Sequence, residues 1–168
     1  DASKLTFINE AGKYQILHLA AHTVIDQENP LYSGLIFTSV PDSSDNLLYV
    51  SELYNLNLNT RLAVLSACET GFGKVERGEG VMSLSRAFAY AGVPSLVMSL
   101  WKIDDKVTAE LMQKFYMHID EGEGIDRALR NAKLDFLEEN KTTHFSHPFY
   151  WAAFVPIGDM RPVVAVQG

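Results

Sequence analysis

The stretch LAVLSACETGFG, residues 62–73, contains the only cysteine of this 168-residue chain, Cys68. A short apolar run leads into two small residues, and Cys68, Glu69 and a glycine-rich segment follow. This pattern is typical of a buried strand that ends in a loop, and in α/β proteins ligands and reactive groups collect at such strand ends. Because free cysteine is also among the most buried residue types, Cys68 is either a packed core thiol or a nucleophile at the mouth of a sheet.

Buried strand-like segments alternate with amphipathic helical segments along the rest of the chain. This alternation favours an α/β protein with a mostly parallel sheet covered on both faces. We expect buried strands at 14–20, 61–67 and 94–101, a β-hairpin formed by 33–39 and 46–52, helices at 81–92, 108–119 and 124–140, and a last strand at 147–158. In the helix at 124–140 we expect seven apolar residues to face inward: Ile125, Ala128, Leu129, Ala132, Leu134, Phe136 and Leu137.

Composition limits the class of protein. The chain is long enough for one domain with a core, and 47% hydrophobic with 21% charged residues is ordinary for a globular protein. It contains no apolar stretch near the roughly 20 residues of a membrane span, and no secretory signal. A net charge of -7 argues against nucleic-acid binding, and a single cysteine, which forms no internal disulfide, fits a reducing cytoplasm. We therefore expect a cytoplasmic protein that binds neither nucleic acid nor a membrane.

Reactive or charged side chains end each of the three predicted buried strands. His22 ends the first strand, Cys68 the second, and Asp104 and Asp105 the third. A thiol with a pKa of about 8.5 is mostly protonated at neutral pH, and a histidine within reach makes it a useful nucleophile. His22 precedes Cys68 by 46 positions (68 − 22), which suits a pair assembled by the fold. From these residues alone, a buried thiol and a histidine bonded to nearby backbone remain the competing interpretation.

Two other motifs point away from a bound metal or cofactor. HLAAH at 18–22 has the spacing of two zinc-binding histidines, but it lacks the glutamate of the HExxH motif and lies in a strand-like run. GFGK at 71–74 lacks the first glycine and the final hydroxyl residue of a phosphate-binding P-loop. We expect no metal and no cofactor. A looser nucleotide- or small-ligand-binding role of the glycine-rich segment stays open as a distant alternative.

Four segments, in order along the chain, resemble the CHAT domain family. They are LHLAAHT (17–23), LAVLSACETGFG (62–73), GEGVMSLSRAFAYAGVPSLVMSLWKIDD (78–105) and HPFYWAAFVPIGD (147–159). Members of this family are caspase-like cysteine peptidase domains of clan CD, related to separase and commonly found behind TPR or other repeat modules. The likeness extends from about Leu5 to Asp159, which predicts a CHAT peptidase domain over 1–159 and a C-terminal tail over 160–168.

The fold that this resemblance implies is the caspase-like α/β sandwich. It has a mostly parallel central sheet, helices on both faces and, in this chain, a β-hairpin insertion. The family fold usually begins with another strand and helix, for which there is no room before the helix that starts near Leu5. The domain is therefore expected to be N-terminally incomplete, with the missing strand on another fragment, on further residues or on a partner chain.

The resemblance also implies the catalytic residues. In this family the second histidine of the HLAAH segment is catalytic and the cysteine of the SACETG segment is the nucleophile. The resemblance therefore implies that His22 is the catalytic histidine and Cys68 the nucleophile. His18 is then a structural residue whose ring packs or bonds to backbone. The oxyanion is expected to accept hydrogen bonds from the backbone N–H groups of Thr23 and Cys68. The family usually has glycine where this chain has Thr23, and a branched side chain resists a positive φ, so turnover is expected to be weaker if that geometry is needed.

Substrate specificity is implied by SLWKIDD, which is similar to a separase-type segment in which an acidic residue meets a basic P1 side chain. Asp105 is the preferred S1 carboxylate and Asp104 the second choice. The alternative is that either residue only caps the helix that starts near Lys106. Glu69 could add negative potential beside the nucleophile, or be a solvated loop residue. Trp101 could form a wall of the pocket, or belong to the core.

The leading hypothesis is a cytoplasmic cysteine endopeptidase that cleaves a protein or peptide substrate after a basic residue and is controlled by an attached repeat domain or partner. The alternative is a catalytically weak CHAT module that acts as an interaction or scaffold domain.

Overall fold

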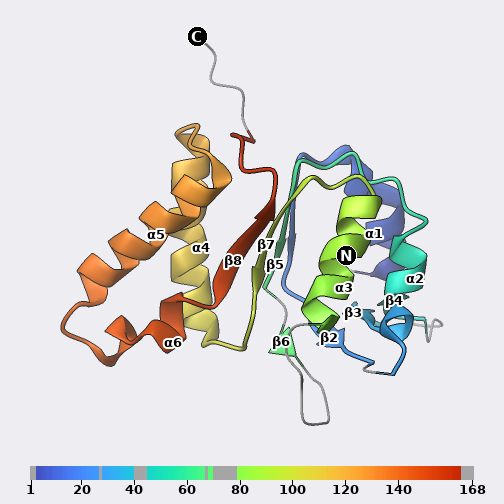
Figure 1. Ribbon diagram of the computed structural model, residues 1–168, viewed down its shortest axis with the longest axis horizontal. Coiled ribbons are helices and arrows are strands. Elements are labelled where there is room, and N and C mark those ends of the chain that lie inside the picture. Colours follow the sequence, from blue (N-terminus) through green and yellow to red (C-terminus); the bar gives the residue numbers. More distant parts are fainter. Residues whose placement is uncertain (1–2, 27, 40–44, 67, 70–78, 164–168) are drawn as a thin grey trace.

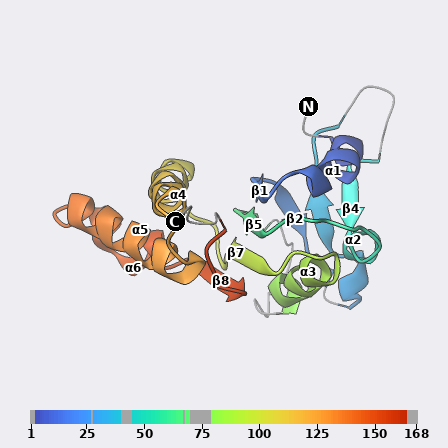
Figure 2. The same cartoon turned by 90° about the horizontal axis from the view of Figure 1, so that it is seen from above.

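A four-stranded sheet runs through the middle of the molecule (Figure 1, Figure 2). The computed structural model describes residues 3–26, 28–39, 45–66, 68–69 and 79–163, and for residues 68, 69 and 79–81 it describes the backbone alone. The strand order is β1 (Ile16–Leu19), β5 (Leu62–Leu65), β7 (Ser95–Ser99) and β8 (Phe154–Gly158). The first three are parallel, and β8 pairs with β7 in the antiparallel sense.

Helices cover both faces of this sheet. One face carries α1 (Lys4–Glu10), α2 (Val50–Leu53) and α3 (Glu79–Tyr90), and the other carries α4 (Asp105–Asp120), α5 (Ile125–Asn140) and α6 (Pro148–Trp151) (Figure 2). Short 3-10 turns lie at Ala11–Lys13, Pro30–Tyr32 and His144–Ser146. The predicted caspase-like α/β sandwich is confirmed. None of the helices in the described part of the chain is long and apolar enough to span a membrane.

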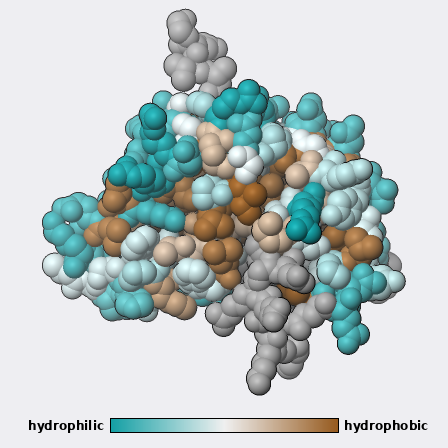
Figure 3. Space-filling view, in the orientation of Figure 1, coloured by the Kyte–Doolittle hydropathy of each residue, from teal (hydrophilic) through white to brown (hydrophobic). Residues whose placement is uncertain are grey.

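Successive side chains of a strand point to opposite faces of the sheet, so the interior consists of two hydrophobic cores. On β5, Ala63 and Leu65 pack with the first helix layer, while Leu62 and Val64 pack with α4 and α5. Because both faces are covered, the strand is apolar at every position. On the side of the molecule shown in Figure 3, hydrophobic residues gather toward the middle, where Figure 1 places β7 and β8.

A second, smaller sheet extends from the carboxyl ends of β1 and β5. Its order is β4 (Leu47–Tyr49), β3 (Gly34–Ile36), β2 (His22–Val24) and β6 (Cys68–Glu69). β3 and β4 form the predicted antiparallel hairpin, which is thereby confirmed. β2 and β6 are parallel and keep the register of β1 and β5, since paired residues are 46 positions apart in both (62 − 16 and 68 − 22). The small sheet therefore continues the β1–β5 pair across a break of two residues in each strand.

Two sequence predictions are wrong in detail. The range 147–158 is not all strand: α6 precedes β8, because Pro148 occupies the first helical turn and the ring of His147 accepts a hydrogen bond from the Phe149 N–H. Leu134 does not face inward, since 46% of it is exposed. It lies about 200° around the helix from Ala132 and Phe136, which are buried, so it cannot share their face.

His118 joins the C-terminal end of α4 to α5. Its Nε2 lies 2.8 Å from the Asp135 carboxylate, and its Nδ1 lies 3.4 Å from Glu121 and 3.7 Å from Glu123. Burial lowers the pKa of His118, but the hydrogen bond to Asp135 and the three negative charges outweigh it and raise the pKa above its ordinary 6.5. A raised folded-state pKa stabilises the fold fully below the unfolded value, and this contribution is lost as pH rises through the folded pKa.

We therefore expect His118→Gln to lower the free energy of unfolding more at pH 6 than at pH 9. Urea denaturation of both proteins at the two pH values measures the difference. An equal cost at both pH values would show that the charge of His118 contributes nothing to stability.

Candidate active site

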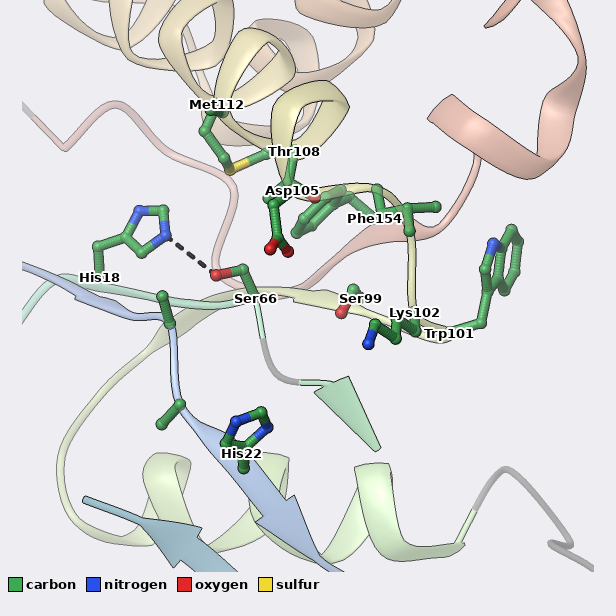
Figure 4. Close-up of a pocket in the computed structure, with 14 residues that line it drawn as sticks. His18, His22, Ser66, Ser99, Trp101, Lys102, Asp105, Thr108, Met112 and Phe154 are labelled. Atoms are coloured by element: carbon green, nitrogen blue, oxygen red, sulfur yellow. Dashed lines mark hydrogen bonds between the residues drawn. The ribbon is translucent and has the colours of Figure 1, made fainter. Parts of the chain in front are cut away.

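A pocket of about 480 Å³ lies at the carboxyl ends of β1, β5 and β7 (Figure 4). His18 and Ser66 line it from the first two strands, and Ser99 lines it from the third. The connection from β7 to α4 and the first turns of α4 close the opposite wall. This is the edge of the sheet at which parallel strands present ligand sites, because the chain leaves each strand there by a loop.

The backbones of His22 and Cys68 are direct neighbours, as Cα partners in the β2–β6 ladder. The His22 side chain is exposed, lines the pocket and has no hydrogen-bond partner among the residues the structure describes. The thiol of Cys68 lies outside the described part of the chain. His22 does not end β1 as predicted, because β1 stops at Leu19 and His22 begins β2. Likewise, Cys68 belongs to β6 and not to the end of β5.

Thr23 occupies an ordinary strand position. It lies in β2 between Leu35 of β3 and Glu69 of β6, and 4% of it is exposed. A residue in a β-ladder is extended, and β-branched side chains favour that conformation. The position therefore does not impose the positive φ that would exclude threonine. Glu69 is placed by its backbone pairing with Thr23, and its side chain is outside the described residues.

The two adjacent aspartates have different positions. The Asp104 carboxylate accepts hydrogen bonds from the N–H groups of Lys106 (2.9 Å) and Val107 (3.3 Å), which makes it the N-cap of α4. Asp105 is the first helical residue, and its exposed carboxylate points into the pocket (Figure 4). Asp104 does not line the pocket. Of the two S1 candidates, the structure brings Asp105 alone to the site.

The different positions of Asp104 and Asp105 predict that alanine substitution at each changes the free energy of unfolding by a different amount. Asp104→Ala is expected to lower the free energy of unfolding by about 1 kcal/mol, because two N–H groups of α4 lose their acceptor. Asp105→Ala is expected to change it by less than about 0.5 kcal/mol, as for other exposed residues. Urea denaturation of the two variants provides the comparison, each being the control for the other. A larger loss for Asp105→Ala would mean that Asp105 caps the helix.

Trp101 joins the pocket to α6. Its indole Nε1–H donates a hydrogen bond to the Phe149 carbonyl (2.8 Å), and the two rings stack with centroids 6.3 Å apart. The side chain is half-buried and lines the pocket, so it both fixes the β7–α4 connection and forms a wall.

The sequence interpretation gave no place in the site to four further residues, which are His18, Ser66, Lys102 and Tyr116. His18 was expected to pack or to bond to backbone. Its ring packs on Tyr116, and its two nitrogens bond to side chains: Nδ1 lies 2.7 Å from the Tyr116 hydroxyl and Nε2 lies 3.2 Å from Ser66 Oγ. The alternation of side chains along β1 indicates where His18 points. His18 lies two residues after Ile16, which packs on the α4 side, so both side chains lie on the same face of the sheet. Lys102 is exposed and also lines the pocket, so among the described residues one positive and one negative side chain, Lys102 and Asp105, line it.

Burial sets the protonation of this histidine–tyrosine pair. Desolvation lowers the pKa of His18 and raises the pKa of Tyr116, so at neutral pH the imidazole and the phenol are both uncharged. The His18 ring keeps an exposed edge toward the pocket while its other side packs on the Tyr116 ring, with centroids 5.8 Å apart.

Two comparisons with known proteins identify the family of this chain. The family model described as "CHAT domain" matches residues 1–159. Tetratricopeptide repeat protein 28 from Mus musculus is 30% identical over 118 residues, 70% of the chain, and the protein of the same name from Homo sapiens is 30% identical over 125 residues, 74% of the chain. The chain spans 5% of the length of each of these relatives. The family model covers nearly the whole length of the chain, and the fold is a caspase-like sandwich. The chain therefore belongs to the CHAT domain family.

Proposed function

We propose that this chain is a cysteine endopeptidase domain that hydrolyses a peptide bond after a basic residue, with Cys68 as nucleophile and His22 as its acid–base partner. The observation that carries the proposal is the strand register, which makes His22 and Cys68 Cα partners at the edge of a pocket containing Asp105. Membership of a family related to caspase-like cysteine peptidases supports the same chemistry.

The proposed reaction has two steps. The Cys68 thiolate attacks the scissile carbonyl, the C–N bond breaks, and His22 gives a proton to the leaving amine. Water then attacks the thioester while His22 takes its proton, which releases the carboxylic acid and restores the thiol. Backbone N–H groups of Thr23 and Cys68 are the proposed oxyanion donors, and one such donor is worth about 2.7–4 kcal/mol of transition-state stabilisation in other enzymes.

Asp105 is the proposed partner of the P1 side chain. Its carboxylate projects into the pocket and, among the described residues, has no hydrogen-bonded partner, so it is available to a cationic ligand. Lys102 opposes this attraction from the same pocket. Removing the Lys102 ammonium, as in Lys102→Met, should therefore improve cleavage after a basic residue.

The test is a panel of fluorogenic peptides with Arg, Lys, Asp or Leu at P1, assayed with the 168-residue chain and with Cys68→Ala. Turnover after Arg or Lys that disappears in Cys68→Ala, falls in Asp105→Asn and rises in Lys102→Met supports the proposal. Turnover that survives Cys68→Ala, or preference for Asp or Leu, contradicts it. Absence of turnover even when the chain is joined to its flanking segments would favour an interaction module.

The relatives suggest the context of the domain. Their name describes them as tetratricopeptide repeat proteins. We accordingly propose that this domain works beside a repeat segment that controls it, in the cytoplasm. Comparison of peptide turnover with and without the flanking chain tests that control.

A further inference from the structure

Three polar side chains from different parts of the fold form a hydrogen-bonded chain that reaches the pocket: His18 and Ser66 line it, and Tyr116 bonds to His18 from outside the lining. Tyr116 comes from α4, His18 from β1, and Ser66 from the residue that follows β5. The Tyr116 hydroxyl lies 2.7 Å from His18 Nδ1, and His18 Nε2 lies 3.2 Å from Ser66 Oγ (Figure 4 shows the second bond). The proposed peptidase mechanism uses none of these side chains.

We assign the directions of both bonds from the hydrogen-bonding capacity of the three side chains. Among the described residues the Tyr116 hydroxyl has His18 as its sole hydrogen-bond partner, and a half-buried phenol needs an acceptor. It therefore donates to Nδ1. A neutral imidazole that accepts at Nδ1 carries its proton at Nε2, so His18 donates to Ser66 Oγ.

Ser66 Oγ is thereby held in one position. One of its lone pairs receives the His18 proton, and its own O–H and its second lone pair remain for a ligand or a neighbouring oxygen. Ser66 and Asp105 line the same pocket from opposite walls, one at the end of β5 and one at the start of α4 (Figure 4). His18 is uncharged and so does not offset the negative charge of Asp105.

We propose that Ser66, positioned by His18 and Tyr116, is a specificity-determining contact of the pocket, which together with Asp105 selects a guanidinium side chain over an ammonium. A guanidinium carries five N–H donors in a planar fork that can reach two acceptors set apart in the pocket, whereas the three donors of an ammonium surround a single nitrogen and span a shorter distance. The inference rests on the proposed function only in that the pocket receives a basic side chain, and it is independent of the cysteine chemistry.

The experiment measures binding without hydrolysis. Nα-acetyl-arginine amide and Nα-acetyl-lysine amide are titrated into the 168-residue chain carrying Cys68→Ala, by calorimetry or by the NMR shifts of the His18 ring. We expect the arginine ligand to bind about tenfold more tightly, as one additional charge-assisted hydrogen bond would provide. Ser66→Ala and Tyr116→Phe should each bring the two affinities to within about twofold of one another. Tyr90→Phe is the matched control, since Tyr90 is 79% exposed and does not line the pocket.

A pair of substitutions at His18 separates positioning from packing. Glutamine offers one acceptor and one N–H donor without charge, so His18→Gln should retain the preference for arginine, while His18→Leu should remove it. Thermal unfolding of each variant confirms that it is folded. An unchanged preference in Ser66→Ala and His18→Leu would overturn the proposal, as would failure of both ligands to bind. If the unsubstituted chain hydrolyses no peptide while the Cys68→Ala chain still binds the arginine ligand selectively, only the proposed peptidase mechanism is overturned.

Discussion

Replacing His22 by alanine is expected to lower kcat/KM for peptides with a basic P1 residue by about 10³-fold or more. His22 is proposed both to stabilise the thiolate and to protonate the leaving amine, and positioned acid–base catalysis typically contributes about 10²–10⁴-fold. Cys68→Ala should lower kcat/KM to about the same value. Because the two side chains act as a unit, the double variant should lose no more activity than either single variant, and peptide assays of all three give this comparison.

The fold should not suffer from the loss of His22. Its side chain is exposed and has no hydrogen-bond partner among the described residues, so its removal should change the free energy of unfolding by less than about 0.5 kcal/mol. His144→Ala, at an exposed histidine near α6, is the matched control and should keep full activity. Near-normal turnover of His22→Ala, or a double variant whose losses multiply, would disprove a catalytic pair.

Phe115→Ala is expected to cost about 3–5 kcal/mol of the free energy of unfolding. The ring is fully buried on α4, in the core that also contains Val64 of β5 and Phe136 of α5. Truncation removes apolar contact area and leaves a cavity that close-packed neighbours cannot fill. A single domain has only about 5–15 kcal/mol of stability, so the variant should unfold at a much lower urea concentration.

The same helix offers the control for this prediction. Met117 is 58% exposed, and Met117→Ala should cost less than about 0.5 kcal/mol. Similar urea midpoints for the two variants would show that α4 does not depend on its buried face. Because α4 also carries Asp105 and Tyr116, a partly unfolded Phe115→Ala protein should lose ligand binding together with the helix.

The architecture and the identity of the catalytic candidates follow from the amino-acid sequence. Period-two and period-3.6 patterns depend on residues that are near in the chain, so the buried strand around Leu62–Leu65 and the helix around Ile125–Asn140 were predictable from the chain alone. The motifs around His22 and Cys68 are sufficient to identify these two residues as catalytic candidates. Leu134 is apolar but lies away from the buried face of α5, a position that its residue type does not indicate.

Which side chains share the pocket depends on the packing of the layers in three dimensions. Asp104 and Asp105 are adjacent and chemically identical, and only the start of α4 assigns one to the helix cap and the other to the pocket. His18 and Tyr116 are 98 residues apart, and they meet because α4 packs across the face of β1. A sequence pattern records which residues prefer to be buried, whereas contacts between a strand and a distant helix depend on how the layers pack. For that reason the Tyr116–His18–Ser66 chain appeared only in three dimensions.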